Sequence, residues 1–325
     1  MTHVKFLGIG SAAPEKVLSN FDFEKMIDTS DEWIRTRTGI SERRIAESDV
    51  ASSDLAYEAS LKALEDAGME PQDLDGIIVG TITPDYIFPS TACVLQSRLG
   101  AKQAFAFDVL AGCSGFIYSL HVAKDMVQSA TARNILVVGA EVLSKIMNYE
   151  DRTTCILFGD GAGAAVISAS DTPGIMSSCL GANGDDWELL YMPGGGSRLP
   201  TSEETLKNGS HFLRMEGKEV FKEAVKALQS SSLKAIEMAD ITPEQIDIFI
   251  PHQANYRIID AVRKRLELPE EKVFSNLDRY GNTSSASVPI ALDEAVKSGR
   301  LKKGDIVVFS AFGAGFTWGA SVVRW

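Results

Sequence analysis

The chain has 325 residues, of which 45% are hydrophobic and 23% charged, as in an ordinary folded soluble protein rather than a disordered one. Its length predicts two domains, or one domain built from two similar halves. The net charge of −12 argues against nucleic acid as the main partner, because phosphate binding requires a basic surface.

The sequence carries no pattern typical of export or membrane insertion. Its amino terminus lacks a charged leader followed by a long apolar run, and no apolar stretch is long enough to span a bilayer. The cysteines Cys93, Cys113, Cys155 and Cys179 form no CxxC pair. We therefore expect free thiols in the reducing cytoplasm.

The first predicted strand covers residues 4–9, and a helix is expected from about residue 20 to 29. The next segment, 30–40, places Trp33 among closely spaced arginines such as Arg37. A charged run of this kind is either a solvated helix end or a nucleotide site, in which an aromatic face contacts a base and guanidinium groups contact phosphates. Both interpretations fit these residues equally well.

An apolar loop follows the next helix and strand. The helix is predicted over residues 55–67, capped by Ser52-Ser53-Asp54, and the strand over residues 74–81. The loop at 84–89 contains Tyr86, Ile87 and Phe88, where loops are normally polar. These side chains are expected to be buried in a pocket or against a partner subunit.

Residues 105–116 are predicted to form a buried strand, a sharp turn between two glycines, and a helix whose first turn contains Cys113. Free N–H groups and the positive end of the helix dipole converge at a helix start, which favours a thiolate. Cys113 is therefore a candidate nucleophile. The alternative is that it is one of the many buried cysteines with a structural role.

The second half of the chain repeats the first. Residues 59–78 align with residues 231–250, which indicates a duplication, and strands that are apolar on both faces indicate sheets covered on both sides. The turn that corresponds to the Cys113 turn is then residues 275–286. This correspondence predicts that Asn282 lies opposite Cys113, near a pseudo-twofold axis.

Two further turns are candidates for the site. His252 follows the predicted strand 246–250, at the carboxyl end where ligands bind in α/β folds. A third turn of this kind is expected at residues 312–319, whose glycines let backbone N–H groups approach a substrate. Dinucleotide binding is discounted because residues 158–163 read GxGxG before a strand, and the sequence contains no P-loop, HExxH motif or metal-spaced Cys/His cluster.

Four separated motifs resemble those of one enzyme family. They are Ala111-Gly112-Cys113-Ser114-Gly115-Phe116, Pro251-His252-Gln253-Ala254-Asn255, Gly281-Asn282-Thr283-Ser284-Ser285-Ala286 and Gly315-Phe316-Thr317-Trp318-Gly319. With them, the chain resembles beta-ketoacyl-acyl-carrier-protein synthase III, the initiating condensing enzyme of fatty-acid synthesis, over essentially its whole length. The resemblance implies an α/β thiolase-like five-layer fold of two duplicated halves, 1–174 with the cysteine and 175–325 with the histidine and asparagine.

The resemblance also implies residue roles. Cys113, His252 and Asn282 would be catalytic, and the backbone N–H groups of Cys113 and Ala314 would form the oxyanion hole. The acyl-CoA would be bound by Thr29, Trp33, Arg37, Arg152, Met215, Gly217, Phe221, Ala254 and Asn255. Phe88 would close the acyl pocket of a partner in a homodimer, and Gln253, Arg257 and Lys264 would dock the acidic acyl-carrier protein. No cofactor, metal, nucleic acid or membrane is expected beside acyl-CoA and malonyl-acyl-carrier protein.

Other functions remain open at this point. A condensing enzyme of secondary metabolism could use the same three residues on another primer or with a malonyl-CoA extender. A cysteine hydrolase would use Cys113 and His252 as nucleophile and base, but the duplication fits it poorly. A non-catalytic member of the fold is disfavoured by the intact set of three residues. The sequence does not determine the length or branching of the primer.

Overall fold

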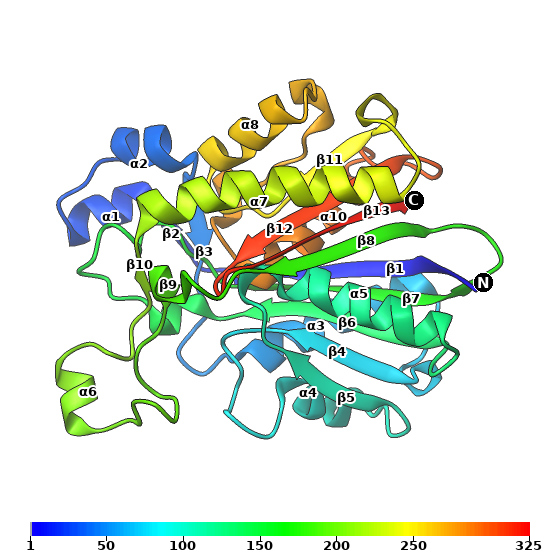
Figure 1. Cartoon of the computed structure of the whole chain (residues 1–325). Coiled ribbons are helices and arrows are strands. Elements are labelled where there is room, and N and C mark those ends of the chain that lie inside the picture. The colour runs from blue at the N-terminus through cyan, green and yellow to red at the C-terminus, as the bar shows by residue number, and fades with distance from the viewer. Residues whose placement is uncertain (1) are drawn as a thin grey trace.

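The computed structural model describes residues 2–325, and two mixed sheets separated and flanked by helices organise the chain (Figure 1). The strands are β1 (His3–Ala12), β2 (Val17–Ser19), β3 (Glu42–Arg44), β4 (Gly76–Gly80), β5 (Phe105–Val109), β6 (Asn134–Glu141), β7 (Gly161–Ser170), β8 (Ile175–Ala182), β9 (Leu190–Tyr191), β10 (Arg214–Met215), β11 (Ile248–Pro251), β12 (Ile306–Gly313) and β13 (Thr317–Arg324).

The helices alternate with these strands along the chain. The α-helices are α1 (Asn20–Met26), α2 (Asp31–Thr38), α3 (Ser52–Ala67), α4 (Thr91–Leu99), α5 (Gly115–Gln128), α6 (Glu203–Lys207), α7 (Gly217–Met238), α8 (Tyr256–Arg265), α9 (Leu277–Tyr280) and α10 (Ser287–Lys297). The 3-10 turns are η1 (Pro71–Asp73), η2 (Gly112–Ser114), η3 (Leu143–Ile146), η4 (Trp187–Leu189), η5 (Pro243–Gln245), η6 (Glu270–Lys272) and η7 (Ser284–Ala286).

The two sheets share one strand pattern. The first has the order β1-β7-β6-β4-β5 and the second the order β11-β12-β13-β8. In the first sheet β4 is parallel to β6, and in the second sheet β11 is parallel to β12. The next two strands of each sheet pair antiparallel, β7 with β6 and β1 with β7 in the first, and β13 with β12 and β8 with β13 in the second. The counterpart of β5 is reduced to one bridge between Phe249 and Val273. A duplication of one α/β unit accounts for this shared order.

Helices form three layers around the two sheets. Helices α3 and α4 cover the outer face of the first sheet, and α7 covers the outer face of the second together with α8, which packs on α7. Helices α5 and α10 lie between the sheets and contact strands of both. The central core is accordingly built from residues such as Phe116, Ile117, Leu292 and Phe309. The predicted division at residue 174 falls between β7 and β8.

Two local predictions were wrong. The helix expected to reach residue 29 ends at Met26. Helix α3 has Ala51 at its N-cap, and the serines expected to cap it instead bind the apolar loop, because Ser52 donates to the Thr83 carbonyl and Ser53 to Asp85. The turn expected at 312–319 does follow a strand, and β12 and β13 pair antiparallel on its two sides from Gly313 and Thr317 onwards. It is the tip of a hairpin.

Candidate active site

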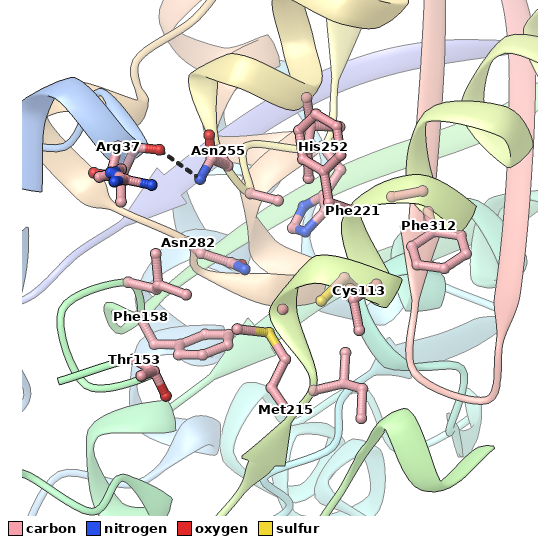
Figure 2. A pocket seen from close by; sticks show the side chains of 18 of the residues that line it. Arg37, Cys113, Thr153, Phe158, Met215, Phe221, His252, Asn255, Asn282 and Phe312 are labelled. Carbon is pink, nitrogen blue, oxygen red and sulfur yellow. Dashed lines mark hydrogen bonds between the residues drawn. The ribbon is translucent and has the colours of Figure 1, made fainter. Parts of the chain in front are cut away.

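One cavity of about 320 Å³ gathers residues that lie far apart in the sequence (Figure 2). Cys113, His252 and Asn282 all line it, and Figure 2 shows the thiol, the imidazole and the side-chain amide directed at the same space. Seven of the residues predicted to bind CoA line the same cavity: Trp33, Arg37, Met215, Gly217, Phe221, Ala254 and Asn255. The cavity therefore connects the predicted catalytic residues to the residues predicted to bind CoA.

Cys113 lies in the 3-10 turn η2, directly before α5 and not inside its first turn. Gly112 makes this turn possible with a φ of +54°, a region that favours glycine. The turn packs so closely on the end of β12 that a Cβ at Gly313 would lie 2.3 Å from the backbone nitrogen of Cys113. A Cβ at Gly112 would likewise lie 2.6 Å from the nitrogen of Ala314. The two N–H groups predicted to form the oxyanion hole belong to segments in direct contact.

Burial works against the thiolate expected at this position. The Cys113 side chain is 8% exposed, and burial raises the pKa of its thiol to about 12, with an opposing hydrogen bond from Ser284 and a further rise from the charge of Glu141. The helix start alone therefore does not ionise the thiol. Cys113 rests in the neutral form.

His252 follows β11 and is neutral because it is buried. Its backbone N–H donates to the Ser310 carbonyl at 2.7 Å, and burial lowers the pKa of the imidazole to about 3. Its Nδ1 lies 2.6 Å from the hydroxyl of Ser287, which also accepts the N–H of Gln253. The Ser287 hydroxyl can therefore donate its own hydrogen to Nδ1, and in that tautomer the ring proton is on Nε2. The imidazole can serve as a neutral N–H donor.

The Asn282 amide is oriented by a single hydrogen bond. Its Oδ1 accepts the backbone N–H of Ser284 at 2.8 Å, so the NH₂ group is the part of the amide left for the cavity. Figure 2 shows this nitrogen directed toward Cys113 and His252. The backbone of Asn282 is fixed as well, because its N–H donates to the Leu157 carbonyl at 2.8 Å and its carbonyl accepts from Gly159 at 3.0 Å.

The cavity opens between α2, α8 and the start of α7. The Arg152 guanidinium lies 5.4 Å from the centroid of the Trp33 ring, and that of Arg37 lies 5.9 Å from it. A base held between Trp33 and Arg152 needs contact distances of roughly 3.5 Å on each side, so Arg152 must move outward to admit it. Its side chain is 50% exposed, which leaves room for this movement. The hydroxyl of Thr29 is buried without a hydrogen-bond partner in the described structure.

Known proteins match the chain over nearly its full length. Family models described as "3-Oxoacyl-[acyl-carrier-protein (ACP)] synthase III" and its C-terminal part match residues 107–184 and 236–325. A beta-ketoacyl-[acyl-carrier-protein] synthase III of Caldanaerobacter subterraneus is 60% identical over 98% of this chain and 97% of its own. The chain belongs to the synthase III family.

Solved structures agree with this membership. The crystal structure of 3-oxoacyl-[acyl-carrier-protein] synthase III from Aquifex aeolicus has a TM-score of 0.92 at 46% identity and covers 99% of this chain and 100% of its own. The priming β-ketosynthase of the R1128 polyketide pathway has a TM-score of 0.92 at 38% identity and covers 99% and 96%. The thiolase-like α/β fold predicted from the sequence is confirmed.

The residues predicted to contact partner proteins lie in different environments. Gln253 is 1% exposed, and its amide binds the Ser275 hydroxyl and the Pro251 carbonyl, which does not fit a docking role. Arg257 and Lys264 are exposed on α8, where Asp260 pairs with Lys264 at 2.7 Å. Phe88 is 83% exposed and lies outside the cavity of its own chain.

Sequence reasoning missed much of the cavity wall. Besides the predicted Gly217 and Phe221, one face of α7 lines it through Val220, Ala224 and Leu228, a helical spacing that the sequence displays. Phe312 of β12 faces the cavity as well (Figure 2). The other missed wall residues come from α2, α8, β9 and the loop before β7, and no sequence pattern marks them. Among residues 2–325, no helix has the length and apolarity to cross a membrane, and no cluster of metal-ligating side chains occurs.

Proposed function

We propose that this chain condenses a short-chain acyl-CoA with malonyl-acyl-carrier protein, releasing carbon dioxide and CoA and forming a 3-oxoacyl-acyl-carrier protein. This is the initiating condensation of fatty-acid synthesis. Membership of the synthase III family supports it. The observation that carries it is the pair of uncharged donors, the imidazole of His252 and the amide of Asn282, directed at the space beside the Cys113 thiol.

The first half of the reaction moves the acyl group to the enzyme. The Cys113 sulfur attacks the thioester carbonyl of acyl-CoA, the carbon–sulfur bond to CoA breaks, and the thiol proton ends on the CoA sulfur. The negative oxygen of the tetrahedral intermediate is bound by the N–H groups of Cys113 and Ala314. Because the thiol and thioester exchange partners, the step needs no net change in charge.

The second half uses the two neutral donors. Loss of carbon dioxide from the malonyl thioester leaves the electron pair of the broken carbon–carbon bond in an enolate. Its oxygen accepts hydrogen bonds from Nε2 of His252 and Nδ2 of Asn282, which stabilise charge that develops only in this step. The enolate carbon attacks the acyl-cysteine, Cys113 leaves as a thiolate, and it takes up one proton from solvent to restore the thiol.

The entrance fits the CoA nucleotide. Trp33 offers an aromatic face, and Arg37 and Arg152 place guanidinium groups beside it, where the phosphates of CoA would lie. The unpartnered hydroxyl of Thr29 is buried and Thr29 does not line the cavity, so this hydroxyl would have to become exposed to bind the ligand. The cavity between this entrance and Cys113, lined by Met215, Gly217, Phe221, Ala254 and Asn255, would then hold the pantetheine arm. No separate cofactor is required by this reaction.

We further propose that the protein is a cytoplasmic homodimer that docks the carrier protein beside α8. Strand β5 lies at the edge of its sheet, and the neighbouring side chains of Ile87, Phe88 and Leu110 are at least 80% exposed. An unpaired edge beside apolar side chains is typical of a surface covered by a second subunit. Arg257 and Lys264 supply positive charge for an acidic carrier protein near the cavity entrance, where Arg257 lies over Phe221.

Variants of the three catalytic residues test the function. Cys113→Ala removes the nucleophile, so no acyl adduct should appear by intact mass after incubation with acyl-CoA. His252→Ala and Asn282→Ala should still form the adduct but release carbon dioxide from malonyl-acyl-carrier protein about 100-fold more slowly, the scale of one lost oxyanion donor. An acyl adduct on the Cys113→Ala protein would contradict the proposal.

A second candidate function differs only in its substrates. The structural similarity to the priming β-ketosynthase of the R1128 polyketide pathway favours a condensing enzyme of a specialised pathway as the alternative. Single-turnover acylation with acetyl-CoA, isobutyryl-CoA and longer acyl-CoAs, followed by malonyl-acyl-carrier protein or malonyl-CoA, separates the two. Preference for malonyl-CoA or for a long primer would support the alternative.

A further inference from the structure

Glu141 is a fully buried carboxylate that has no role in the mechanism above. It ends β6, and its carboxylate accepts hydrogen bonds from two separate segments. On one side it binds the backbone N–H and the hydroxyl of Thr83, at 3.1 and 2.6 Å. On the other side it binds the hydroxyls of Ser284 and Ser285, at 3.1 and 2.8 Å. Burial raises the pKa of Glu141, and the single hydrogen of Ser285 is shared between Glu141 and the Gly80 carbonyl. The backbone N–H groups of Ile82 and Thr83 can only donate, and obligatory donors favour the ionised carboxylate.

The serine turn that Glu141 holds begins with a strained residue. Ser284 has a φ of +49°, in the left-handed region that non-glycine residues rarely adopt. Such a conformation persists only where its surroundings hold it. The hydroxyl of Ser284 is held by Glu141, while its backbone N–H donates to Oδ1 of Asn282. The position of Ser284 therefore decides which way the Asn282 amide points.

We infer that Glu141 is a positioning residue that, through Ser284, keeps the Asn282 amide turned with its NH₂ group toward the cavity. The inference rests on the proposed function, because that function makes Asn282 a donor to the enolate oxygen. Without the hydrogen bond to Glu141, Ser284 can relax toward an ordinary backbone conformation. Its N–H would then move away from Oδ1 of Asn282. The amide would then lose its orientation, and the decarboxylation step would lose a donor.

The same carboxylate influences the nucleophile. The titratable groups around Cys113 are Glu141 in the interior, and His252 and Arg37 in the cavity wall. The negative charge of Glu141 raises the pKa of the Cys113 thiol, while the Ser284 hydroxyl lowers it. Removing the charge and removing the hydroxyl should therefore move the titration of Cys113 in opposite directions. A general loosening of the fold would not shift the pKa of Cys113 in opposite directions in the two variants.

The central variant is Glu141→Gln, which keeps the shape of the side chain. The fixed N–H groups of Ile82 and Thr83 should attract its amide oxygen, so its NH₂ group faces Ser284 and Ser285. The serine hydroxyls can rotate and accept, but a charge-assisted hydrogen bond becomes a neutral one. Ser284→Ala removes the link between the carboxylate and the turn, and with it the hydroxyl that lowers the pKa of Cys113. The control is Asp160→Asn, a second fully buried carboxylate, whose partners Ala46 and Ser144 lie outside the cavity.

The test measures two half-reactions and one pH profile on full-length protein. Release of carbon dioxide from malonyl-acyl-carrier protein should fall about tenfold in Glu141→Gln, the scale of one weakened hydrogen bond to a charged group. Acylation of Cys113 from acyl-CoA should change far less. The pH profile of Cys113 alkylation by iodoacetamide should shift to lower pH in Glu141→Gln and to higher pH in Ser284→Ala, and Asp160→Asn should match wild type.

Several results would overturn the inference. They are unchanged carbon dioxide release in Glu141→Gln, an equal loss of both half-reactions, or a control that behaves like Glu141→Gln. If Glu141→Gln does not fold, Ser284→Ala still decides, because wild-type carbon dioxide release in that variant contradicts the inference. A wild-type protein that releases no carbon dioxide would instead refute the proposed function, while the alkylation profiles would still report on Glu141.

Discussion

The contact between the Cys113 turn and the end of β12 makes Gly313 a sharp test of the site. A Cβ at Gly313 would lie 2.3 Å from the nitrogen of Cys113, whereas ordinary contacts of a Cβ begin at 3.4 Å. The nearest atoms, which belong to Gly112, Cys113 and Ser114, are all backbone atoms and cannot rotate away. Gly313→Ala should therefore separate the two segments by about 1.1 Å, the difference between these distances, and a misplacement of about 1 Å can cost about 100-fold in rate.

The assay for Gly313→Ala is the rate at which Cys113 is acylated by acyl-CoA, followed by intact mass. We expect a loss of about 100-fold, because the N–H groups of Cys113 and Ala314 no longer converge on the oxyanion. Gly184→Ala is the matched control, since a Cβ there meets nothing within 4 Å. Acylation of a folded Gly313→Ala protein at the wild-type rate would refute the proposed oxyanion geometry.

Two further predictions concern stability and assembly. Because burial lowers the pKa of His252 from 6.5 to about 3, the unfolded chain binds a proton below pH 6.5 that the folded chain rejects, so stability falls as the pH drops through this window. Denaturant titrations should show wild type losing about 2 kcal/mol relative to His252→Asn on going from neutral pH to about pH 5; a constant difference would contradict the buried neutral imidazole. Phe88→Asp should weaken a dimer in sedimentation, whereas Phe21→Asp, at another exposed phenylalanine, should not; equal behaviour would argue against the proposed interface.

The proposed catalytic residues could be predicted because their local patterns are strong. A cysteine between two glycines after an apolar strand, a histidine at a strand end and an asparagine in a duplicated turn each carry a signal within a few residues. The internal duplication predicted that two of these residues lie close together in space, since it relates two turns that more than half the chain separates. The cavity brings all three side chains together as this relation requires.

The environment of these residues was decided by tertiary structure alone. The helix start predicted a thiolate at Cys113, but burial keeps the thiol neutral, because desolvation outweighs the hydrogen bonds that would stabilise a thiolate there. Gln253 was predicted to dock the carrier protein, yet it is buried and its side-chain oxygen accepts a hydrogen bond from the Ser275 hydroxyl. The link from Glu141 through Ser284 to Asn282 joins the end of β6 in the first half to the turn before α10 in the second half, and no local pattern records which carboxylate reaches which turn.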